Sequence, residues 1–146
     1  MSRYISEANQ NQVRERACYL CEYCHVSEQW QYIPFTVDHI IPLSKDGIRG
    51  IENLALACFN CNRQKSDRLT AIDLESGAEV PLFNPRIHSW YQHFIWSKDA
   101  SSIIGLTPIG RATVTALNFN RQRFINIRAE DSKIGRHPPP NDPIQT

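Results

Sequence analysis

Two pairs of cysteines with the spacing Cys-x-x-Cys constrain the possible folds of this chain more than any other feature. They are Cys21 with Cys24, and Cys58 with Cys61. Two such pairs form the usual ligand set of a structural zinc ion, which holds four thiolates in a tetrahedron. The pattern therefore predicts one Zn²⁺ per chain, bound by these four cysteines, which closes the intervening residues into a loop.

The first pair also permits two other interpretations. Cys21-x-x-Cys24-His25 has the form of a c-type haem attachment site, and a single Cys-x-x-Cys occurs in thioredoxin-like redox proteins. Haem attachment belongs to exported proteins, and the first twenty residues lack the apolar stretch of a secretory signal. A redox pair needs a βαβ setting, which this sequence does not predict. Because neither interpretation explains the second pair, structural zinc is favoured.

The chain has five cysteines, and an odd number fits poorly with a closed set of disulfides. We expect the fifth, Cys18, to pack as a small apolar residue on a helix, with replacement of a zinc ligand as the alternative. Without an export signal, the expected compartment is the reducing cytoplasm, where cysteine pairs bind metal. No apolar run approaches the roughly 20 residues of a membrane span, so no membrane partner is expected.

Local patterns predict an α+β fold. In the first half, Ser6 is placed to cap a helix, and a β-branched and aromatic run that Pro34 interrupts predicts a strand. A loop then leads to a short segment of ambiguous type, strand or turn, and a second helix is expected to follow the second cysteine pair. These elements are expected, in order, over residues 6–20, 31–41, 42–52, 54–57 and 60–67.

Turn and cap signals organise the second half. Thr107-Pro108 predicts a helix start, because a capping hydroxyl precedes a proline at the first helical position. Asn120 is a candidate cap for a later helix. The aromatic residues Trp90, Tyr91, Phe94 and Trp96 are expected in the core, with base stacking as the alternative. The other expected elements are a turn at 75–78 between short strands, paired strands at 93–96 and 102–105, and helices through 112–117 and 121–129.

Charged residues are nearly balanced, with 16 Lys and Arg against 15 Asp and Glu among 146 residues. The chain is long enough for one domain with a modest core, and any nucleic-acid surface on it must be local. The basic residues after position 110 predict either such a surface or a solvated helix face. They are Arg111, Arg121, Arg123, Arg128, Lys133 and Arg136.

A second group of polar residues lies between and beside the cysteine pairs: Asp38, His39, Asn53, Asn62 and Lys65. Phosphodiester hydrolysis needs an activated water, neutralised charge at phosphorus and a stabilised leaving oxygen. Oxygen atoms of Asp38 and Asn62 suit a hard divalent cation. The imidazole of His39, with an ordinary pKa near 6.5, suits a general base. Adjacent strand residues point to opposite faces, so we expect the strand to twist or end where Asp38 and His39 meet one site.

The run Asp38-His39-Ile40-Ile41-Pro42, then Asn53-Leu54, then Cys58-x-x-Cys61-Asn62-x-x-Lys65 resembles the HNH endonucleases, which have the ββα-metal fold. The resemblance covers about residues 14–68. It implies that His39 is the general base, that Asn53 orients its ring, and that Asp38 and Asn62 hold a catalytic cation. Independently of the resemblance, Lys65 lies one turn beyond Asn62 on the same face of the expected helix, where it is expected to meet a phosphate oxygen.

Asn62 occupies the position where many members of the family have histidine. An amide oxygen suits Mg²⁺ or Mn²⁺, whereas imidazole suits later transition metals. The residues also have plainer interpretations: a surface Asp-His pair, a turn cap at Asn53, a helix cap at Asn62 and a solvated Lys65. Taken together, and framed by the cysteine pairs, they favour the catalytic interpretation.

The predicted architecture is a ββα-metal HNH core over residues 1–68, clipped by the four-cysteine zinc site. An α/β extension over 69–136 packs on it, and 137–146 form a disordered tail. Segments 80–86 and 105–112 resemble small stand-alone bacterial HNH proteins. The predicted function is metal-dependent cleavage of DNA, expected to be double-stranded. The alternatives are a non-catalytic zinc module that binds nucleic acid and an HNH nuclease that acts on RNA.

Overall fold

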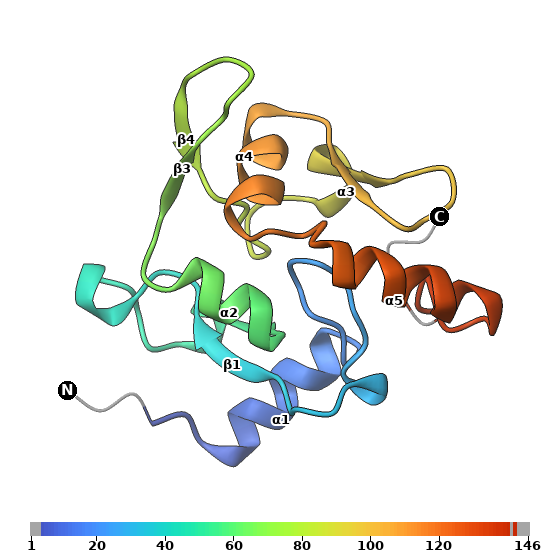
Figure 1. Cartoon of the computed structure of the whole chain (residues 1–146). Helices are drawn as coiled ribbons and strands as arrows, with labels where there is room; N and C mark the ends of the chain where they lie inside the picture. Colours follow the sequence, from blue (N-terminus) through green and yellow to red (C-terminus); the bar gives the residue numbers. More distant parts are fainter. Residues whose placement is uncertain (1–3, 141, 143–146) are drawn as a thin grey trace.

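The computed structural model describes residues 4–140 and 142. Within these residues it confirms the α+β class, with three separate two-stranded antiparallel sheets and helices around them (Figure 1). The α-helices are α1 (Glu7–Arg16), α2 (Phe59–Lys65), α3 (Trp90–His93), α4 (Pro108–Ala116) and α5 (Gln122–Lys133). The strands are β1 (Thr36–His39), β2 (Leu54–Ala57), β3 (Thr70–Ile72), β4 (Glu79–Pro81), β5 (Phe94–Trp96) and β6 (Ile103–Gly105). Short 3-10 turns are η1 (Glu28–Trp30), η2 (Leu43–Lys45) and η3 (Ile51–Asn53).

The first helix begins as predicted and ends early. Ser6 caps α1, and its hydroxyl accepts a hydrogen bond from the Asn9 N–H at 3.1 Å. The expected helix over 6–20 stops at Arg16, because Cys18 and Tyr19 adopt left-handed backbone with φ of 54° and 61°. This turn directs the chain into the first cysteine pair.

The strand expected over 31–41 is also shorter, and β1 begins only at Thr36. The backbone of Phe35 is already bonded to side chains: its N–H donates to Glu28 Oε2 at 2.8 Å, and its carbonyl accepts from Arg14 at 2.8 Å. Neither group is free for a strand partner, and Pro34 before it carries no N–H. Residues 31–34 are exposed as a result.

Strands β1 and β2 pair in antiparallel register, with Asp38 opposite Ala55 and His39 opposite Leu54. Helix α2 follows β2 after a single residue, which completes a ββα unit. Figure 1 shows β1 lying between α1 and α2. The segment of ambiguous type, 54–57, is therefore a strand, and all four of its residues are buried.

One hydrophobic core unites the two halves of the chain. Val13 and Leu54 from the first half share it with Phe83, Trp90 and Phe94 from the second. Trp90 and Phe94 are 4% and 0% exposed, so the expectation that the aromatic residues build the core is confirmed for both. The extension over 69–136 therefore packs directly against the ββα unit.

The extension contains the expected hairpins and helices. Sheet β3–β4 encloses the turn at 75–78, sheet β5–β6 pairs Ile95 with Ile104, and Thr107 caps α4 through the Gly110 N–H at 3.0 Å. The predicted cap of α5 is wrong. The Asn120 amide oxygen instead accepts the Ile103 N–H at 2.9 Å. Arg121 occupies the cap position, and its side chain forms no capping hydrogen bond to the first turn of α5.

The end of the chain contradicts the expected disordered tail over 137–146 wherever the structure describes it. His137 is 9% exposed, and its Nε2 lies 2.7 Å from the Ala100 carbonyl. Asp142 is 6% exposed, and its Oδ2 lies 2.9 Å from Nδ1 of His25. Prolines can pack wherever their N–H is not needed, so this composition did not exclude order. Residues 141 and 143–146 lie outside the described part.

Because the two halves share one core, the first half is not expected to fold alone. A fragment ending at residue 68 loses Phe83, Trp90 and Phe94, and with them a large part of the buried aromatic surface. We expect this fragment to be unfolded even with zinc present, whereas the full chain gives a dispersed amide spectrum in ¹H–¹⁵N NMR. A dispersed spectrum from the fragment would contradict the shared core.

Candidate functional site

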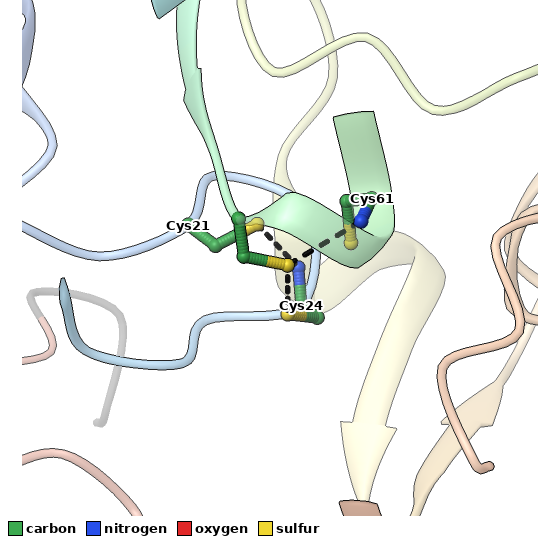
Figure 2. A group of neighbouring side chains, drawn as sticks. Cys21, Cys24 and Cys61 are labelled. Atoms are coloured by element: carbon green, nitrogen blue, oxygen red, sulfur yellow. Dashed lines mark hydrogen bonds between the residues drawn. The ribbon is translucent and has the colours of Figure 1, made fainter. Parts of the chain in front are cut away.

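Four buried thiols form a compact cluster at the junction of the two halves. The Sγ atoms of Cys21, Cys24, Cys58 and Cys61 all lie within 4.8 Å of one another. Figure 2 shows Cys21 and Cys24 on one loop facing Cys61 on α2. Ligands about 2.3 Å from a tetrahedral zinc ion are about 3.8 Å apart. The Cys24–Cys58 Sγ distance of 3.7 Å agrees with that geometry.

The chemistry of the cluster also fits a cation. Burial raises the pKa of the Cys61 thiol, because a thiolate without a counter-charge is costly in the interior. Four buried thiols at this distance cannot all ionise unless a metal ion neutralises them. The predicted ligands therefore meet in space, and Cys18, half-buried on the turn after α1, lies outside the cluster.

Side chains from the extension hold the first cysteine loop in place. Arg86 forms an ion pair with Glu22. The Trp90 indole N–H donates to the Tyr23 carbonyl at 2.9 Å, and the His25 ring packs on Trp90 with centroids 4.6 Å apart. With the His25–Asp142 contact, three residues of this loop have a partner from beyond residue 80.

A buried arginine of α5 adds a positive charge beside the cluster. Arg128 is 8% exposed, donates to the Phe119 carbonyl at 2.7 Å and lies over the Trp96 ring at 5.8 Å. Burial lowers its pKa, and the nearby Cys24 opposes that effect. A divalent ion bound by four thiolates would carry net negative charge, and Arg128 would then stabilise it.

A groove of 470 Å³ lies between β1 and α2. Asp38 and His39 reach it from β1, and Asn62 reaches it from α2, so three of the predicted residues converge. β1 ends at His39, which agrees with the expectation that the strand ends where adjacent side chains share a site. The residues that line the groove are Ile5, Thr36, Val37, Asp38, His39, Pro42, Leu43, Asn62, Arg63, Ser66 and Asp67.

Asn62 does not cap α2. The cap is Cys58, whose Sγ accepts the Cys61 N–H at 3.4 Å, and Asn62 lies within the helix with its N–H bonded to the Cys58 carbonyl. Its side chain is half-buried at the groove wall. The helix-cap interpretation of Asn62 is therefore excluded.

Asn53 lies outside the groove lining and binds backbone instead of the His39 ring. Its amide oxygen accepts the Ile41 N–H at 2.9 Å, and its amide nitrogen donates to the carbonyls of Ile41 at 3.0 Å and Ile48 at 2.8 Å. Asn53 is 5% exposed. These bonds fix the loop that follows His39, so any effect of Asn53 on the ring is indirect.

Lys65 is 5% exposed, and its Nζ donates to the Ile40 carbonyl at 2.8 Å. This geometry does not support the expected phosphate contact, because the ammonium is buried and bonded. Burial lowers the pKa of Lys65, while the negative charges of Asp38 and Asp67 oppose that shift. Lys65 joins α2 to the residue after His39 and places a positive charge near Asp38.

Two charged residues of the groove were not predicted from the sequence. Arg63 lies on α2, Asp67 lies two residues beyond the end of α2, and both line the groove. The helix expected over 60–67 would place these two residues on one face, because residues four apart share a face, although α2 itself ends at Lys65.

The predicted basic residues after position 110 differ in their contacts: some are buried or paired within the protein, and others are exposed. Arg111 binds both carboxylate oxygens of Asp73, and Arg128 is buried. The charge and hydrogen bonds of Arg111 hold the pKa of Asp73 well below its usual range. Arg121 and Arg123 at the start of α5 are exposed.

Comparison with known proteins agrees with this geometry. Residues 20–68 match the family model described as HNH endonuclease, which confirms the resemblance over that segment. The match covers about a third of the chain and includes both cysteine pairs and the groove residues from β1 and α2. It supports nuclease-type activity on a nucleic acid. No curated protein and no solved structure matches the chain. Among the described residues, no helix has the length and apolar character that crossing a membrane requires.

The cluster generates a prediction with a matched control. Cys58→Ser keeps a side chain that can cap α2 but removes one of the four sulfur ligands. We expect this variant to lose zinc and to melt at lower temperature, because the binding free energy of a structural zinc is folding free energy. Elemental analysis and thermal unfolding measure both effects.

Cys18→Ser is the control, since Cys18 lies outside the cluster. It is expected to keep one zinc per chain. Full zinc content in Cys58→Ser, or equal loss in Cys18→Ser, would contradict the assignment.

Proposed function

We propose that this chain is a metal-dependent endonuclease that hydrolyses phosphodiester bonds in double-stranded DNA. The observation that carries the proposal is the convergence of Asp38, His39 and Asn62 on one groove, beside a four-thiol cluster, within a segment that matches the HNH family. The cluster binds structural zinc. A reducing compartment such as the cytoplasm keeps its thiols available for metal.

Asp38 and Asn62 hold the catalytic cation, Mg²⁺ or Mn²⁺. They offer a carboxylate and an amide oxygen from opposite walls of the groove, and such oxygens suit hard cations. When bound, the cation neutralises charge at phosphorus and stabilises the leaving oxygen. Two protein ligands leave coordination positions for water and phosphate oxygens, as Mg²⁺ usually requires.

His39 removes the proton from the attacking water. His39 lies at the end of β1 and lines the groove. The residue is 7% exposed, so the surrounding atoms restrict the orientation of its ring. A base must hold its position as the proton transfers. The hydrogen bonds between Asn53 and Ile41 and between Lys65 and Ile40 fix the backbone of the two residues after His39. Fixing this backbone helps to position the His39 imidazole.

His39→Ala is expected to lower the cleavage rate by about 10²–10⁴-fold, because the loss of a general base has that effect. The fold and the melting temperature should change little. Nicking of supercoiled plasmid with Mg²⁺ measures the rate, and a structured RNA substrate in parallel tests the alternative substrate. Wild-type rates in His39→Ala would contradict its role, and cleavage of RNA alone would contradict DNA as substrate.

Asn53→Ala is expected to behave differently, because it leaves the Ile41 N–H and two carbonyls without their partner. An unsatisfied buried group costs about 1–3 kcal/mol. Asn53→Ala should therefore lower both the melting temperature and the rate. An unchanged melting temperature would show that the loop does not depend on these bonds.

Asn62 variants test the cation site. Asn62→Ala should raise the Mg²⁺ concentration needed for activity, because one oxygen ligand is lost. Asn62→His should keep activity and shift it toward Mn²⁺, Co²⁺ or Ni²⁺, since imidazole favours later metals. Metal titrations of the cleavage rate measure both effects. Unchanged metal curves in Asn62→Ala would remove Asn62 from the proposed ligand set.

A further inference from the structure

We propose that a strip of two arginine–phenylalanine pairs, running from the groove onto the extension, binds the phosphate backbone of the DNA beyond the cleaved bond. The strip consists of Phe59 and Arg63 on α2 and Arg121 and Phe124 at the start of α5, joined by Asn60. It rests on the proposed function, since its partner is the strand whose phosphodiester occupies the groove.

Each arginine of the strip lies over an aromatic ring. The Arg63 guanidinium carbon is 5.9 Å from the centroid of Phe59, and that of Arg121 is 5.5 Å from the centroid of Phe124. A guanidinium held on a ring keeps its edge available for hydrogen bonds, and that edge matches two phosphate oxygens. Phe59 is itself 54% exposed, so the Arg63 guanidinium lies over a ring at the protein surface.

Asn60 connects the two pairs across the two halves of the chain. Its amide oxygen accepts a bond from Arg121 at 3.2 Å, and its amide nitrogen donates to the Leu117 carbonyl at 2.9 Å. Asn60 lies one helical turn before Arg63, and Arg63 lines the groove. The strip is therefore continuous with the candidate site at one end and reaches α5 at the other, and Figure 1 shows the start of α5 near α2.

Arg63 and Arg121 differ from other arginines of the chain in how their charge is balanced. Arg14, Arg86 and Arg111 each form an ion pair with a carboxylate. Within the part of the chain that the structure describes, no carboxylate forms an ion pair with Arg63 or Arg121. Two exposed guanidinium groups that continue from the candidate site favour a polyanion that spans both. The extension then contributes to substrate binding.

Arg121→Gln tests the strip, with Lys133→Gln as the matched control. Lys133 is on the same helix, and its loss removes the same charge, but it pairs with Glu130 at the far end of α5. Binding of a fluorescein-labelled DNA duplex is measured by anisotropy between about 50 and 200 mM salt, where each phosphate contact contributes about 0.9 to the slope of log K against log salt. Both variants carry the His39→Ala change, are zinc-loaded and receive no added Mg²⁺.

We expect Arg121→Gln to reduce that slope by about 0.9 and to weaken binding, while Lys133→Gln leaves both unchanged. Arg121→Lys should restore the slope, which separates charge from folding, and melting temperatures are compared for all variants. Equal binding by Arg121→Gln and Lys133→Gln overturns the strip but leaves the nuclease proposal intact. Failure of the His39→Ala protein, without a change at Arg121 or Lys133, to bind the duplex also overturns the strip. A wild-type protein that binds in this way and cleaves nothing supports the strip and overturns the nuclease proposal.

Discussion

Four buried thiols, two before β1 and two at the start of α2, lie within 4.8 Å of one another, and the shape of the groove depends on that contact. Cys58 caps α2, and Cys61 directly precedes Asn62. Holding this second cysteine pair in place therefore also sets the direction of α2 and the position of Asn62 in the groove wall. Beside the first pair, Glu22 accepts the Leu56 N–H at 2.9 Å and attaches that loop to β2. A tetrahedral ion at this point would hold both walls of the groove together.

The extension is part of this arrangement and not an attached module. Its aromatic residues complete the core, and Arg86, Trp90 and Asp142 hold residues of the first cysteine loop. Arg128 brings a positive charge to the thiols from the middle of α5. The beginning of the same helix presents Arg121 beside α2. One face of the extension therefore stabilises the cluster, and its exposed edge is available to a nucleic acid.

Features encoded by local spacing could be predicted from the sequence. The four cysteines, the order of the ββα unit, the cap at Thr107 and the residues Asp38, His39 and Asn62 stand out by residue type and by spacing within each motif. The structure brings the four cysteines together and the three groove residues together. Within one element the period decides which residues share a face: alternate residues in a strand, and residues three or four apart in a helix.

Features that depend on distant backbone partners could not be predicted in this way. Asn53 binds a backbone twelve positions away, and Lys65 bonds a carbonyl 25 positions away, so their residue types alone suggested more direct roles. Asp142 meets His25 across 117 positions, and no local pattern indicates this contact. These contacts form only when the two halves pack.

We propose that the chain binds two chemically different cations at separate places: zinc among the four thiols, and a hard cation between Asp38 and Asn62. Anomalous scattering from crystals of the zinc-loaded protein soaked in Mn²⁺, recorded at the zinc and manganese edges, tests it directly. We predict a zinc peak enclosed by the four Sγ atoms and a manganese peak in the groove, in contact with Asp38 and Asn62. Manganese confined to the thiol cluster, or bound away from both residues, would contradict a cation site between Asp38 and Asn62.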